Sequence, residues 1–172
     1  MNVSMFTGFE GRINRAKWWL GTIILAVIAV ILTWILSAII GISLIAPEGT
    51  TLAADTISSY VRRVAIVQLI VFVVLVYPWL SLMIKRLNDR DRPSWYAYVF
   101  LAPSVLSIIF GLLGLTMTAT QAGGVSMANQ SALGWIINIL IFVIGIWALI
   151  ELGILKGTTG PNQHGPDPLA AP

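Results

Sequence analysis

Residues 93–150 read PSWYAYVFLAPSVLSIIFGLLGLTMTATQAGGVSMANQSALGWIINILIFVIGIWALI, and none of these 58 side chains is charged. A helix needs roughly 20 apolar residues to cross the ~30 Å hydrocarbon core of a bilayer. The run is therefore too long for one span and has the right length for two. We expect the break at 118–132, which is small, polar and rich in turn-forming residues. This predicts helices over about 95–117 and 133–155.

Two more uncharged stretches lie upstream and predict helices over about 18–45 and 64–84. We expect the first to be a retained helix, because its apolar region is about twice as long as that of a secretory signal peptide. The composition agrees with a membrane protein: 58% of the 172 residues are hydrophobic, 10% are charged, and the mean hydropathy is +0.90. A soluble domain carries about a quarter charged residues. We predict an all-α integral membrane four-helix bundle, with residues 1–172 forming a single membrane domain.

Basic residues set the predicted orientation. The segments 1–17, 85–94 and 156–172, together called the rim, share one side of a four-span protein and hold eight of its ten Lys and Arg residues. Cytoplasmic loops of membrane proteins carry such an excess, so both termini are expected to be cytoplasmic. Anionic headgroups at the inner face account for the net charge of +3 without a nucleic-acid partner.

The first rim segment offers a candidate binding site. In a helix begun near Gly11, the side chains of Arg12, Arg15 and Trp19 would lie on one stripe, at i, i+3 and i+7. The planar guanidinium group suits bidentate phosphate or carboxylate contacts, and a tryptophan sits well at headgroup level. The alternative is generic anchoring, which any arginine and any tryptophan would provide.

The other two rim segments carry charge and turn signals. In KRLNDRDRPSWY, Asp89 lies four residues after Lys85 and three after Arg86, which are pairing distances on a helix, and Trp95 suits an interfacial belt. These charges indicate a structural salt-bridge network or a binding site, and the two are compatible. The Pro- and Gly-rich tail from Gly157 cannot form a helix or a strand. It is either disordered or docked onto the rim through residues such as Asn162 and Asp167.

Within the predicted spans, strongly polar side chains are few. Glu151 is expected to pair with a basic residue of another segment near the inner interface, or else to couple a proton or an ion in a transporter. Gln68 and Asn138 are expected to bond between helices, with a substrate pocket as the alternative. His164 has no companion ligand, and the chain lacks cysteine, HExxH, P-loop and GxSxG motifs. We therefore expect no catalytic residue, no metal, no cofactor and no enzymatic activity.

Taken together, the three rim segments resemble the bacterial family called domain of unknown function 805. Its GR-x-x-R-x-x-[FW]-W element is matched by Gly11, Arg12, Arg15, Trp18 and Trp19. Its basic-RL-H-D element, closing on Ser-Gly-Trp-Trp, is matched by Arg86, Leu87, Asp89, Ser94 and Trp95. Its tail pattern is matched by Gly157, Gly160, Asn162, Gly165, Asp167 and Pro168.

This chain departs from the family pattern at Asn88, where histidine is common, at Arg92-Pro93, and at His164, where an aromatic residue is usual. The resemblance implies a small four-helix protein of the bacterial inner membrane whose rim elements belong together. It implies no settled biochemical activity.

Two functions follow as hypotheses. The first is a non-enzymatic interaction protein whose rim forms a platform for an anionic lipid headgroup or for a membrane or cytoplasmic partner protein. The platform residues would be Arg12, Arg15, Trp19, Arg86, Asp89, Trp95, Asn162 and Asp167. The second is a small transporter or channel, formed as a homo-oligomer, that uses Gln68, Asn138 and Glu151.

Overall fold

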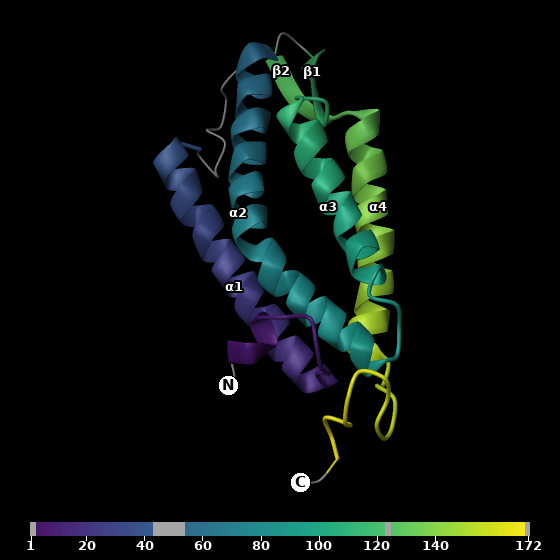
Figure 1. Ribbon diagram of the computed structural model, residues 1–172. Helices are drawn as coiled ribbons and strands as arrows, with labels where there is room; N and C mark the ends of the chain where they lie inside the picture. Colours follow the sequence, from purple (N-terminus) through teal and green to yellow (C-terminus); the bar gives the residue numbers. More distant parts are fainter. Residues whose placement is uncertain (1–2, 43–53, 123–124, 171–172) are drawn as a thin grey trace. The chain divides into compact units, whose positions relative to one another are not determined.

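A computed structural model describes residues 3–42, 54–122 and 125–170 (Figure 1). The chain divides into two compact units, and each of the four α-helices contributes residues to both. The first unit comprises Met1–Ala29, Val73–Ala102 and Val143–Pro172. The second unit comprises Val30–Phe72 and Pro103–Phe142. Eight of the ten basic residues belong to the first unit.

The first half of the chain forms a short 3₁₀ turn, η1 (Val3–Phe6), and two long helices, α1 (Arg15–Ile40) and α2 (Ala54–Asp89). Helix α2 is longer than the predicted span 64–84 at both ends. The prediction ended the span at its flanking charges, but a helix can continue beyond the part that crosses the bilayer. The predicted loop over 46–63 is therefore helical from Ala54 onward, while residues 43–53 lie outside the described part of the chain.

Helix α2 ends in a tight backbone cap. Asp91 has a left-handed backbone (φ 54°), and the amide of Arg92 donates to the carbonyl of Leu87 at 2.9 Å. This is the Schellman arrangement, in which glycine is the usual left-handed residue. Aspartate is among the few other residues that adopt this conformation readily. The cap turns the chain sharply before Pro93.

The second half contains α3 (Tyr96–Leu112), a β-hairpin, α4 (Ala132–Ala148) and a π-helical turn, η2 (Leu149–Ile154). Gly114 (φ 71°) ends α3 with the same kind of cap, several residues before the predicted end at 117. The expected irregular break at 118–132 is instead an antiparallel pair, β1 (Met117–Ala122) and β2 (Val125–Gln130). Its register pairs Met117 with Gln130 and Ala122 with Val125.

Three helices in the described residues are long and apolar enough to cross a membrane: Arg15–Ile40, Thr56–Asp89 and Ala132–Ile154. Helix α3 has 17 residues, about 25 Å at 1.5 Å per residue, which is the lower limit for a span. Large apolar side chains such as Trp34 and Phe142 point outward, 67% and 68% exposed. Lipid would cover such side chains in a membrane, so the protein is an all-α, four-helix membrane protein.

The buried cores of the two units differ in character. In the second unit the buried side chains are mostly aliphatic, among them Ile57, Ala65 and Ile137. In the first unit, apolar Leu82 and Leu87 are buried beside the charged Arg86 and Asp89. Burying a charge costs free energy unless it is paired and hydrogen-bonded. The partners of these charges therefore decide what the rim can do.

Candidate functional site

The C-terminal end of α2 is the centre of the rim, and one of its faces binds the N-terminal segment. Ser81, Lys85 and Asn88 follow one another at i, i+4 and i+7, so they lie on one side of the helix. All three side chains donate to backbone carbonyls of residues 4–11. Ser81 Oγ bonds Gly8 O at 2.7 Å and Lys85 Nζ bonds Thr7 O at 2.7 Å. Asn88 Nδ2 bonds the carbonyls of Phe9 and Gly11 at 3.0 and 3.1 Å.

The adjacent face of α2 carries a buried charge cluster. Asp89 accepts from Arg86 and, at 3.2 Å, from Nε of Arg12. The side chains of Arg12, Arg86 and Asp89 are 1%, 0% and 4% exposed. Arg12 also donates to the tail carbonyls of Thr158 at 2.7 Å and Gly160 at 2.8 Å. Both guanidinium groups are thus occupied within the protein, and neither is open to a ligand.

The end of η2 is held by side chains from α1, from α2 and from Arg90, which directly follows α2. The last carbonyls of a helix have no partner within it and carry partial negative charge. Here the five consecutive carbonyls of residues 151–155 each accept a bond from a side chain. The donors, in order along the chain, are Arg90, Arg86, Trp19 Nε1, Arg15 and again Arg86. Arg15 and Trp19, predicted to bind a headgroup, therefore bond the end of η2.

The tail from Gly157 is docked. The amide of Thr158 donates to Asp89 O at 2.8 Å, and Asn162 Nδ2 donates to Asn88 O at 3.0 Å. Asp167 closes a turn by accepting from the amides of Leu169 at 2.9 Å and Gly160 at 3.0 Å. These two N–H groups hold the pKa of the Asp167 carboxyl below its usual value. Of the two states expected for the tail, the structure shows the docked one.

Two predicted details of the rim are wrong. Helix α1 begins at Arg15, so Arg12 precedes the helix and does not share a helical stripe with Arg15 and Trp19. Lys85 does not pair with Asp89. Its ammonium group instead donates to the carbonyls of Ser4 and Thr7 in the N-terminal segment. The prediction weighed charged partners alone, because backbone carbonyls carry no signal in a sequence.

Other predicted site residues lie apart from this cluster. Trp95 is 55% exposed and makes an edge contact with the ring of Tyr96. Glu151 forms ion pairs with Arg90 and, at 3.2 Å, with Arg92, which confirms a basic partner from another segment. Sequence reasoning missed Ser81 and Arg90. The polar spacing at 81, 85 and 88 was a signal for Ser81, whereas Arg90 had none beyond its charge.

The predicted intramembrane residues separate into the two units. Gln68 and Asn138 line one cavity of the second unit, and Asn138 Nδ2 donates to Gln130 Oε1 at 2.6 Å. Glu151 belongs to the first unit with its arginine partners. Gln68 and Asn138 thus share a cavity whose lining does not include Glu151.

A cavity of about 730 Å³ lies beside the N-terminal segment in the first unit. Its charged lining is Arg12, Lys17 and Lys85 against Glu10, an excess of positive charge. Its apolar lining is Met5, Phe9, Ile13 and Leu20. Within the described residues, no group of three His, Cys, Asp or Glu side chains could hold a metal. The lining of this cavity thus combines an excess of positive charge with an apolar part.

The three rim motifs thus meet at one place in the first unit, which is the arrangement their family resemblance implies. Over residues 6–126 the chain matches the model of a family described as "Protein of unknown function (DUF805)", a match to more than half of its length. The chain belongs to this family.

Curated relatives of this DUF805 protein are bacterial inner membrane proteins. It is 24% identical over 167 residues to inner membrane protein YhaH of Escherichia coli K12, covering 97% of this chain and 92% of YhaH. It is 23% identical over 163 residues to inner membrane protein YhaI of the same strain, covering 95% of this chain and 87% of YhaI. No solved structure matches it significantly. This DUF805 protein is therefore a multi-pass protein of the bacterial inner membrane.

Two of its departures from the family pattern lie together. Asn88 and His164 both line a second cavity of the first unit, of about 550 Å³, although 76 residues separate them in the sequence. Asn88 belongs to α2 and His164 to the docked tail. The imidazole of His164 in this DUF805 protein thus lines the same cavity as position 88, where the family commonly has a histidine.

Proposed function

We propose that this DUF805 protein is a non-enzymatic membrane protein whose rim binds an anionic phospholipid headgroup at the cavity beside Lys17. Both termini would face the cytoplasm, because the basic residues concentrated in the first unit favour that side. The buried cluster of Arg12, Arg86 and Asp89 would act as the frame that shapes the rim.

Lys17 carries the proposal. Its side chain is exposed, it lines the cavity, and its ammonium group makes no hydrogen bond or ion pair to any described residue. Arg12 and Lys85 line the same cavity but are bonded to backbone carbonyls. They would contribute a positive field, and Lys17 would supply the direct contact with the phosphate.

The apolar lining favours a lipid over a free phosphate. Ile13 lies four residues before Lys17 and Leu20 three residues after it, and Leu20 is exposed, so an acyl chain could contact Leu20 while the headgroup meets the ammonium. A lysine near an anionic membrane surface contributes about 1 kcal/mol of attraction. Loss of Lys17 should then weaken the affinity for an anionic lipid roughly fivefold.

The test is thermal unfolding of the detergent-purified protein during titration with phosphatidylglycerol or with phosphatidylcholine. We expect phosphatidylglycerol to raise the unfolding midpoint more than phosphatidylcholine does, and Lys17→Gln to reduce that difference. Arg15→Gln is the matched control, since it removes the same charge two residues away but does not line the cavity. Equal stabilisation by the two lipids would contradict the proposal, as would an unchanged preference in Lys17→Gln. If Lys17→Gln keeps the lipid preference and a protein copurifies, the rim would instead bind a protein partner.

A further inference from the structure

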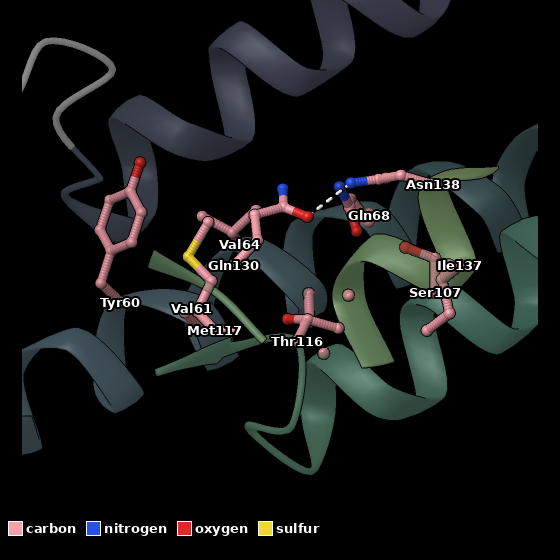
Figure 2. A pocket seen from close by; sticks show the side chains of 13 residues that line it. Tyr60, Val61, Val64, Gln68, Ser107, Thr116, Met117, Gln130, Ile137 and Asn138 are labelled. Carbon is pink, nitrogen blue, oxygen red and sulfur yellow. Dashed lines mark hydrogen bonds between the residues drawn. The ribbon is translucent and has the colours of Figure 1, made fainter. Parts of the chain in front are cut away.

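The cavity of the second unit that Gln68 and Asn138 line includes none of the rim residues in its lining. It has a volume of about 270 Å³ (Figure 2). It is bounded by α2, α3, α4 and the base of the hairpin, where Met117 of β1 pairs with Gln130 of β2. All its lining residues belong to the second unit. Its polar side chains are Tyr60, Gln68, Ser107, Thr116, Gln130 and Asn138.

The lining carries no charge. All 13 of the residues that surround the cavity are neutral, and Val61, Val64 and Ile137 form its apolar wall. A charged ligand would lose its hydration there without gaining an opposite charge, which costs several kcal/mol. The lining therefore offers no compensating charge to an ion and favours a neutral occupant.

The amide groups have unused hydrogen-bonding capacity. Gln130 Oε1 accepts from Asn138 Nδ2 at 2.6 Å (Figure 2). Gln130 Nε2 and Asn138 Oδ1 bond to no described residue. The amide of Gln68 bonds to none of the described residues. A carboxamide can make up to four hydrogen bonds. Donors and acceptors thus line the same small space within an apolar helical bundle.

We propose that this cavity binds a small, uncharged, polar molecule that both donates and accepts hydrogen bonds. The volume of about 270 Å³ is slightly below the ~300–1,000 Å³ typical of ligand pockets, which limits the occupant to roughly ten heavy atoms. Gln68 and the Gln130–Asn138 pair recognise its polar groups, and the aliphatic wall contacts its carbon atoms. The site is independent of the lipid proposed at the rim.

A cysteine reporter tests this site, and the natural chain has no cysteine to interfere. Ser107→Cys is nearly isosteric and places a thiol in the lining, whereas Ile109→Cys, on the same helix, is exposed and outside it. Only the thiolate reacts, and it forms in water rather than in hydrocarbon. With hydroxyethyl methanethiosulfonate as the reagent, Ser107→Cys should be labelled at least about tenfold faster than Ile109→Cys in membrane vesicles.

Acetamide, acetate and methylammonium are probes of similar size and different charge. Acetamide should slow the labelling of Ser107→Cys, and the two ions should not. Adding Gln68→Leu should weaken this protection about tenfold. Asn138→Leu should weaken the protection by acetamide as well, so the test does not depend on the correct folding of a single variant. Gln163→Leu, the same kind of change in the tail, should leave it intact.

Each other outcome overturns a part of the proposal. Labelling of Ser107→Cys as slow as that of Ile109→Cys would show that the cavity is closed to water and solutes. Fast labelling without protection by acetamide would show a water-filled space with no binding site. Equal protection by the ions would contradict the neutral ligand class.

Discussion

Replacement of Arg12 by glutamine should release the C-terminal tail from the rim. Arg12 is 1% exposed and bonds Asp89 together with the tail carbonyls of Thr158, Gly160 and Gly165. Breaking a buried ion pair from one side costs about 3–5 kcal/mol. Because Asp89 keeps its pair with Arg86, we take the lower end, about 3 kcal/mol.

Hydrogen exchange measures this loss directly. The amides of Thr158, Asn162 and Gly165 are all hydrogen-bonded in the docked tail. If they exchange by local undocking, a loss of about 3 kcal/mol accelerates their exchange on the order of 10²-fold. Mass spectrometry of peptides from residues 157–170, with the protein in lipid nanodiscs, would resolve this change.

Arg15→Gln is the matched control because it makes the same substitution at an exposed site. Arg15 donates one bond, to Ile154 O at 2.9 Å, which lies before the tail. Its loss should cost about 1 kcal/mol or less and leave tail exchange within about fivefold of the wild type. Unchanged tail exchange in Arg12→Gln would refute the reasoning, because the buried guanidinium would then contribute nothing to docking.

Three further outcomes follow from the same contacts. Gly157→Ala should undock the tail as strongly as Arg12→Gln, because a Cβ there would lie 2.1 Å from Asp89 Oδ2, and exchange of the same peptides tests it. Glu151→Gln should lower the thermal unfolding midpoint in nanodiscs, since it leaves Arg90, 10% exposed, without its carboxylate partner. For Asp167 the pKa is depressed by folding, so its stabilising effect is complete above the unfolded pKa of about 3.9 and is lost as the pH falls through the lower folded value. The protection of the tail amides from hydrogen exchange, corrected for the intrinsic exchange rate at each pH, should therefore decrease below about pH 4 in the wild type. In Asp167→Asn this protection should not change with acid.

The sequence predicted those features that depend on local spacing. Uncharged runs of the right length located the helices, and the three-residue separation of Arg86 and Asp89 predicted their ion pair, which the structure contains. The expectation of a basic partner for Glu151 rested on the cost of an unpaired charge in a span. Each of these follows from composition or from helical period.

Long-range partners could not be predicted in the same way. Arg12 bonds carbonyls of the tail 146–153 residues away, and every residue of a chain has a carbonyl. The headgroup role predicted for Arg15 and Trp19 rested on residue type, whereas the helix end at 151–155 is their partner in the structure. The hairpin did have a sequence signal, since two glycines between two short segments favour a β-hairpin, but the small and polar composition of 118–132 predicts only an irregular break.

Native mass spectrometry of the protein extracted with its own lipids tests the central claim most directly. The wild type and Arg15→Gln should both retain an anionic phospholipid, and Lys17→Gln should retain markedly less of it, in line with a roughly fivefold weaker affinity, while the fold is kept. An identical set of bound lipids in the wild type and in Lys17→Gln would contradict the claim that the cavity beside Lys17 is the lipid site.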